Sequence, residues 1–317
     1  MVVVVHPAQE VAARGGQPRR ALHVWGCRPM IATMLPPDNH VHTEWSWDAA
    51  HGSMEASCAR AVELGLGTIA FTEHMDWTRW VIAPEHKAAM QRDAFRVGPD
   101  DRFNPPTLDS DGYQACIQDC RSRYPGLRIL SGVELGEPHW FGDQCAALLA
   151  TGGYDRVLGS LHSLRIEDRP WIVDDLYSPY APGDLEPDGI MRAYLAEALR
   201  MIESSHHFAV LAHIDYPVRA WPAHAGHFAP TDYEEEYRSV LDALARSGRA
   251  LEVNTTVPLR AEIVRWWYEV GGDAISFGSD AHRPSQLARH FPEVSAMVEG
   301  VGFRPGRDAH DFWRRQR

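Results

Sequence analysis

The sequence predicts an α/β barrel built from seven repeats of a strand followed by a helix. Seven short apolar runs of strand length end in polar residues, and longer segments with helix signals separate them. Runs that stay apolar throughout are typical of parallel strands that are buried on both faces. A chain of 317 residues can form one large domain, and regular alternation of strands and helices favours one barrel over two domains.

The predicted strands all end in residues that can carry chemistry. In a parallel barrel the C-terminal strand ends share one face, and barrel enzymes place their active site there. In chain order these strand ends are 39–42, 69–74, 130–134, 157–162, 210–213, 251–254 and 275–280.

Four intervening segments carry helix start or stop signals. Thr231 and Glu234 form a capping-box pattern, and two other segments have proline at or near the first turn. The predicted helices are 53–64, which ends before Gly65 as expected for a glycine at C′, then 187–204, 231–248 and 258–270.

Two segments do not follow this alternation of strands and helices. Residues 1–35 show no clear period, so we expect a poorly ordered extension followed by a single barrel domain at 36–317. Residues 77–109 contain four prolines and little periodicity. Long irregular segments in compact domains are often functional, so we expect this one to cover the substrate.

Composition excludes several classes of partner. The net charge is −12, with no basic cluster beyond Arg19, Arg20 and the last residues, which argues against nucleic acid. No apolar run approaches the ~20 residues of a membrane helix. Five cysteines form no C-x-x-C pair, so we expect free thiols and a cytoplasmic protein.

Histidine, glutamate or aspartate stands at six of the seven strand ends. Residues i and i+2 of a strand point to the same side, and imidazole with carboxylate suits zinc, iron and manganese. Buried ionisable groups are costly unless they are paired or metal-bound, and one ion with an open position uses about three protein ligands. The set therefore predicts two or three divalent ions. Its members are His40, His42, His74, Glu134, His162, His213, Asp280 and His282, and the exceptional strand ends in Asn254.

Six motifs at these positions resemble the polymerase and histidinol phosphatase (PHP) family. The resemblance runs from Asp38 to Gly306, and L-E-V-N-T-T at 251–256 is similar to the histidinol-phosphatase branch. The motifs are H-V-H-T (40–43), F-T-E-H (71–74), G-V-E (132–134), G-S-L-H (159–162), A-H-I-D (212–215) and G-S-D-A-H (278–282).

The resemblance implies a distorted (β/α)7 barrel with a trinuclear metal site. It assigns the first metal to His40, His42, Glu134 and Asp280. The second metal would share Glu134 as a bridging carboxylate and add His162 and His213. The third would take Asp48, His74 and His282, with Asp48 standing where many relatives carry histidine.

The implied activity is metal-dependent hydrolysis of a phosphomonoester on a small phosphorylated metabolite, as in histidinol phosphatases. The expected catalytic residues are Asp280, Glu134 and His282. We expect Arg260 and Arg165 to bind the phosphate, because arginine can fork onto two oxygens, and Asn254 to join them. Glu73 is expected to support a ligand from behind. Segment 163–171 is longer and more charged than its counterpart in many histidinol phosphatases, so phosphatase chemistry is better supported than histidinol phosphate as the substrate.

Three alternatives are weighed against this interpretation. A phosphodiesterase acting on nucleotides or cyclic phosphates stays open. An amidohydrolase barrel usually bridges its metals with a carbamylated lysine, but the only lysine here is Lys87, in the irregular segment, and Glu134 holds the bridging position. A non-catalytic metal-binding module of the PHP type would be expected to lose ligands, whereas this chain fills every ligand position.

Overall fold

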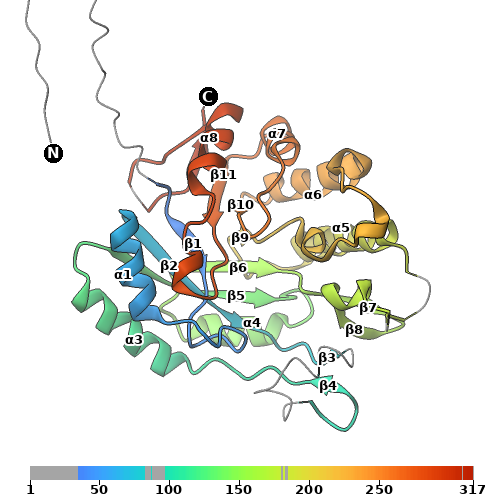
Figure 1. Ribbon diagram of the computed structural model, residues 1–317, viewed down its shortest axis with the longest axis horizontal. Helices are drawn as coiled ribbons and strands as arrows, with labels where there is room; N and C mark the ends of the chain where they lie inside the picture. The colour runs from blue at the N-terminus through green and yellow to red at the C-terminus, as the bar shows by residue number, and fades with distance from the viewer. Residues whose placement is uncertain are drawn as a thin grey trace, which may run out of the picture. The chain divides into compact units, whose positions relative to one another are not determined.

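Seven parallel strands form the centre of the barrel in the computed structural model, which describes residues 35–82, 87, 97–179, 181–182, 185–308 and 310–316 (Figure 1). Each strand pairs in parallel with the next along the chain. The seven are β1 (Asp38–Val41), β2 (Thr68–Met75), β5 (Arg128–Gly136), β6 (Arg156–Ser160), β9 (Val210–Leu211), β10 (Ala250–Asn254) and β11 (Ala274–Gly278). All seven predicted strands are therefore confirmed.

The end of β1 is hydrogen-bonded to the segment that follows β11. Val41 forms a parallel bridge with Ala281, the His42 N–H donates to the Ala281 carbonyl over 2.8 Å, and the Asp280 N–H donates to the His40 carbonyl over 2.8 Å. The beginning of β11 instead pairs antiparallel with β13 (Trp313–Arg315), which pairs with β12 (Phe303–Arg304). The ring is therefore distorted at the junction of β1 and β11, and the predicted barrel class is confirmed.

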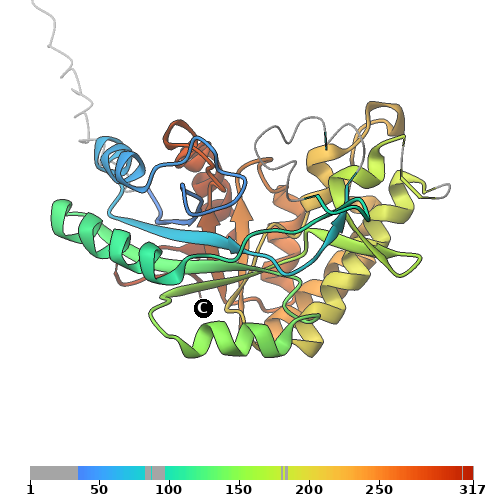
Figure 2. The ribbon, with the colours of Figure 1, turned by 90° about the horizontal axis from the view of Figure 1, so that it is seen from below.

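The described residues form seven helices, which lie beside the strands (Figure 2). Their buried apolar side chains belong to the hydrophobic core. These helices carry several of the largest fully buried side chains, among them Trp267 and Tyr113. The helices are α1 (Met54–Leu64), α3 (Ser110–Arg123), α4 (Gly142–Ala150), α5 (Pro187–Ser204), α6 (Glu234–Arg246), α7 (Ala261–Glu269) and α8 (Phe291–Val301).

Helix α1 shows how local sequence sets its ends. The Ser53 hydroxyl accepts from the Ala56 N–H over 3.3 Å, a cap that contributes about 1 kcal/mol in comparable helices. Gly65 ends the helix in the left-handed region at φ 71° and donates back to the last turn. Alanine there would be strained, because its Cβ disfavours this conformation.

Two predicted helix starts are wrong. Residues Pro230–Tyr233 form a 3-10 turn, so α6 begins at Glu234 and Thr231 does not cap it. The Glu234 carboxylate contacts Arg238 at 2.6 Å instead of reaching back. Helix α7 begins at Ala261, after a turn in which the Asn254 side chain accepts from the Thr256 N–H over 2.8 Å.

A second sheet forms beside the barrel mouth. Its order is β4-β3-β8-β7, from β3 (Trp80–Val81), β4 (Arg102–Phe103), β7 (Ser163–Ile166) and β8 (Arg169–Ile172). The predicted irregular segment 77–109 supplies β3 and β4, and the hairpin that follows β6 supplies β7 and β8. The Trp80 indole N–H donates to the Ser163 hydroxyl over 2.5 Å, which joins the two parts. Positions 83–86 and 88–96 of the predicted cover lie outside the described residues.

Three smaller predictions concern the rest of the chain. The expected extension at 1–35 falls almost entirely on positions 1–34, which lie outside the described residues. The four cysteines within the described part, Cys58, Cys116, Cys120 and Cys145, are free thiols. No described helix combines the length and apolar character needed to cross a membrane.

Candidate metal centre

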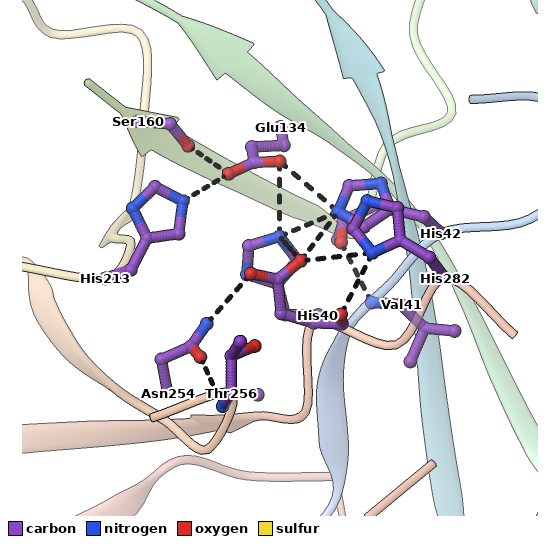
Figure 3. A network of polar contacts seen from close by, with 12 residues as sticks. His40, Val41, His42, Glu134, Ser160, His213, Asn254, Thr256 and His282 are labelled. Atoms are coloured by element: carbon purple, nitrogen blue, oxygen red, sulfur yellow. Dashed lines mark hydrogen bonds and ion pairs between the residues drawn. The ribbon is translucent and has the colours of Figure 1, made fainter. Parts of the chain in front are cut away.

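The strand ends bring the predicted ligands together at the barrel mouth. Strand register places His74 of β2 directly beside Glu134 of β5. Figure 3 shows His40, His42, His213 and His282 gathered around Glu134. All eight residues predicted from the strand ends, together with Asp48 from the loop after β1, take part in one network of polar contacts.

Glu134 lies at the middle of this network. Its Oε2 is 3.2 Å from His40 Nε2, 3.3 Å from His42 Nε2 and 3.0 Å from His74 Nδ1. Its Oε1 is 2.8 Å from His213 Nε2 and 3.3 Å from His162 Nε2. The two carboxylate oxygens therefore face two different groups of imidazoles, which is the arrangement that a bridging ligand requires.

The donor set fits divalent cations. Glu134 Oε2 is buried and accepts no hydrogen bond from the described residues, and the Nε2 atoms of His40 and His42 lie 3.0 Å apart. Ligand atoms around a tetrahedral zinc, with bonds of about 2.1 Å, stand roughly 3.4 Å from one another. Converging lone pairs at such distances are costly unless a cation lies between them.

Contact distances divide the ligands into candidate sets. The sets are His40, His42 and Asp280; His40, Glu134 and His213; His42, His74 and His282; and His74, Asp76 and His162. Asp48 Oδ2 lies 3.3 Å from His74 Nε2 and 3.0 Å from His282 Nε2, so it closes the third set.

Electrostatics keep the carboxylates of the centre ionised. Burial alone would raise the pKa of Glu134, but the imidazoles of His40, His162 and His74 hold it well below its ordinary value. Burial also opposes ionisation of Asp280, and Arg219 and His40 hold its pKa well below the usual range. The pKa of His213 is lowered to about 4, mainly by burial, so at neutral pH this imidazole is uncharged and keeps a lone pair.

Two buried glutamates hold the ligand histidines from behind. Glu252 Oε1 lies 2.6 Å from His40 Nδ1, and its Oε2 accepts from the His213 N–H over 2.7 Å. Sequence reasoning missed Glu252, although it lies two residues before Asn254 and therefore on the same side of β10. The expected supporting role of Glu73 agrees with its contacts: the Ser46 hydroxyl donates to it over 2.6 Å, and Ser46 Oγ is 3.0 Å from His42 Nδ1.

The guanidinium at the centre belongs to Arg219, which sequence reasoning did not single out. Arg219 lies in the 3-10 segment Tyr216–Ala220 that follows β9, and its Nη2 donates to Asp280 Oδ2 over 2.5 Å. Its charge also lies 4.7 Å from the centre of the Tyr216 ring. The available signal was its position six residues after His213, in the loop at the active face.

Two of the three predicted substrate-binding residues are exposed and lie outside the cavity, and the third is buried beside Asp280. Arg260 is exposed, with Nη2 3.5 Å from His227 Nε2. Arg165 is exposed and stacks at 4.2 Å over the Trp140 ring. Neither lines the cavity above the metal ligands. Asn254 is buried, and its amide donates to Glu252 Oε2 over 3.1 Å and to Asp280 Oδ2 over 3.4 Å. These three assignments stay predictions, whereas Arg219 lines the cavity.

A cavity of about 90 Å³ opens above the ligands. Predicted metal ligands and Arg219 line it, together with a set of aromatic and apolar side chains that we call its wall. That wall consists of Trp47, Trp80, Ile172 and Tyr216. The space holds several water-sized groups, which is room for a phosphoryl group and the part of a substrate next to it.

Known proteins resemble this chain across the barrel. The PHP domain family model matches residues 38–256. A protein of Clostridium acetobutylicum named "Probable histidinol-phosphatase" is 25% identical over 275 residues, which cover 84% of this chain and 94% of that protein. A protein of the same name from Deinococcus radiodurans is 27% identical over 278 residues, which cover 84% and 94%.

A solved structure gives the same picture of the fold. The crystal structure of a histidinol phosphate phosphatase from Lactococcus lactis, in complex with zinc, L-histidinol and phosphate, superposes with a TM-score of 0.72. The two chains are 19% identical, and the superposition covers 88% of this chain and 99% of that one. At this identity the likeness shows a shared fold.

Proposed function

The chain belongs to the PHP family, and from this premise we propose that it is a metal-dependent phosphomonoesterase whose substrate is a small phosphorylated metabolite. The observation that carries the proposal is Glu134, whose two oxygens face separate groups of imidazoles below a cavity that also holds Arg219. A site of this kind combines clustered cation ligands with a fixed positive charge, and both suit a dianionic phosphate ester.

We propose that two to three ions of zinc, iron or manganese occupy the centre. Glu134 would bridge two of them, and the other predicted ligands would complete the sets above. Asp76 is left out, because its oxygens already face the Trp47 indole N–H and His162 Nδ1. Bound ions of this type neutralise the phosphate charge and lower the pKa of a water toward ~7. The ionised state of Glu134 and Asp280 supports the proposal, because each carboxylate is ready to accept a cation.

Arg219 would bind the phosphoryl oxygens. Its Nη2 contacts Asp280, so the guanidinium is held in one orientation and its other N–H groups can face the cavity. Charge developed on phosphoryl oxygens in the transition state is stabilised by such preorganised donors. Asp280 also accepts from Asn254, and its Oδ1 lies 3.7 Å from His282. This ionised carboxylate could accept a proton from the attacking water and then pass it to the leaving oxygen.

Histidinol phosphate is the leading substrate. Two relatives carry the name "Probable histidinol-phosphatase", and the Lactococcus lactis structure contains histidinol and phosphate, the two products of that hydrolysis. The wall of Trp47, Trp80 and Tyr216 would contact the flat leaving group.

Turnover of a substrate panel tests the proposal. The metal-loaded protein should release phosphate from histidinol phosphate with a kcat/KM at least tenfold above that for other phosphorylated metabolites and for bis-aryl phosphodiesters. A preference for diesters would establish the phosphodiesterase alternative. Full metal content without turnover of any phosphate ester would establish the non-catalytic module.

A further inference from the structure

One buried carboxylate outside the predicted ligands contacts two residues that line the cavity. Asp76 lies two residues after His74, just beyond β2, and is 2% exposed. Its Oδ2 accepts the indole N–H of Trp47 over 2.9 Å, and its Oδ1 lies 3.3 Å from His162 Nδ1. Trp47 belongs to the wall of the cavity, whereas His162 Nε2 faces Glu134 Oε1 at 3.3 Å.

The neighbouring strand leaves space for this carboxylate. Gly136 ends β5, and a Cβ at that position would overlap Asp76 Oδ1. Any other residue at position 136 would therefore displace the Asp76 carboxylate from the place where it meets Trp47 and His162. Nearby, Glu137 accepts from the backbone N–H groups of His162 and Ser163 over 2.7 and 2.9 Å, which holds the turn that carries the His162 ring.

The position of the His162 proton follows from these partners. An ionised carboxylate accepts hydrogen bonds but donates none, so the contact with Asp76 places the proton of a neutral His162 on Nδ1. Nε2 then keeps its lone pair toward Glu134, in the direction that a ligand to the second metal needs. Metal-binding histidines usually donate their other N–H to a carboxylate or carbonyl in this way.

We propose that Asp76 is a positioning residue that sets two features at once: the tautomer and orientation of His162 on the metal side, and the place of the Trp47 indole on the substrate side. The substrate half of this inference rests on the proposed phosphatase function, and the His162 half does not. Because both partners of Asp76 are N–H donors, the residue at position 76 needs two acceptor atoms.

Asp76→Asn tests this requirement with almost no change in volume. An amide has one acceptor oxygen, so asparagine can serve Trp47 or His162 but not both. If its oxygen serves Trp47, its NH2 group faces His162 Nδ1 and favours the opposite tautomer, and one metal equivalent should be lost to a chelator about 10–100-fold more readily. If its oxygen serves His162, Trp47 loses its partner and KM should rise by a similar factor.

Two further variants separate the halves of the proposal. Trp47→Phe keeps an aromatic ring but removes the N–H, so KM should rise several-fold while metal retention stays at the wild-type level. Glu197→Gln is the matched control, because Glu197 Oε1 binds His139 Nε2 at 2.7 Å and the Trp140 indole N–H at 3.0 Å, away from the cavity. It should lower the melting temperature and leave metal retention and KM unchanged.

The tautomer is also measurable without a variant. Nitrogen-15 chemical shifts of His162 in the zinc-loaded wild type should report protonation of Nδ1, and a proton on Nε2 would overturn the proposal even if Asp76→Asn does not fold. Wild-type metal retention and KM in Asp76→Asn, or equal losses in Glu197→Gln, would overturn it as well. An unchanged KM in Trp47→Phe would overturn the substrate half. Metal retention and the tautomer need no substrate, so failure of the phosphatase function would be seen separately.

Discussion

Replacing Arg219 with alanine separates the geometry of the cavity from the expectation based on sequence. The side chain is 20% exposed and donates to Asp280 Oδ2 over 2.5 Å, so the variant loses a positive charge and also leaves Asp280 with fewer partners. A hydrogen bond to a charged group contributes about 1.5–3 kcal/mol, so kcat/KM should fall by about one to two orders of magnitude. Lysine at this position should recover only part of the loss, because a point charge cannot reproduce the fork of two N–H donors.

The assay is steady-state phosphate release by the metal-loaded protein, with metal content measured on the same samples. Metal content should stay at the wild-type level in Arg219→Ala, because Asp280 keeps its oxygens and Asn254 still donates to Oδ2. Arg260→Ala is the matched comparison, since Arg260 is exposed beside His227 in the neighbouring loop. A wild-type kcat/KM in Arg219→Ala, together with a loss of one to two orders of magnitude in Arg260→Ala, would refute the geometric reasoning and return the phosphate contact to Arg260.

Three other predictions test the metals, the domain boundary and stability. Purified protein should carry two to three equivalents of zinc, iron or manganese, and Glu134→Gln should lose metal and activity together; an active variant with full metal content would remove the bridging role. We propose that residues 1–35 form an extension to a barrel domain at 36–317, so deletion of residues 1–33 should leave turnover and melting temperature nearly unchanged, whereas a large fall in either would show that the extension packs on the barrel. The pKa of Glu197 is lowered to about 2, because its contacts with His139, Arg200 and Trp140 outweigh the effect of burial. Glu197→Gln should therefore cost about 1–2 kcal/mol of unfolding free energy above pH 5, after allowance for the partly solvated partners. That difference should shrink as the pH falls toward 2, because the wild-type carboxylate then takes up its proton; urea midpoints that differ equally at pH 6 and pH 2.5 would contradict the cause.

The ligand positions could be predicted because strand geometry is regular. Parallel strands bring their C-terminal ends to one face, and the pleat gives residues i and i+2 the same direction. Sequence spacing was therefore enough to predict that His40 and His42 lie close to Glu134, which is more than ninety residues away in the chain. The same regularity predicted that Asp280 lies beside the other ligands. In the structure its backbone N–H donates to the His40 carbonyl across the junction of the first and last strands.

The helix boundaries show where neighbouring residues override a local capping pattern. Thr231 and Glu234 have the spacing of a capping box, yet Pro230 begins a 3-10 turn and Arg238 engages the Glu234 carboxylate. Ser53 and Gly65 do form the caps that their positions predict, and α1 begins and ends there.

The sequence by itself determined the fold class, the seven strands and the identity of the side chains that converge at their ends, because each of these follows from a period of two residues and a shared strand direction. Tertiary structure alone decided that Arg219, rather than Arg260 or Arg165, faces the cavity. It also decided that Glu252 and Asp76 hold ligand histidines from behind. These side chains act through loops or through contacts across strands. A loop residue has many backbone conformations open to it, and only packing against the completed barrel selects the one that points its side chain at the site.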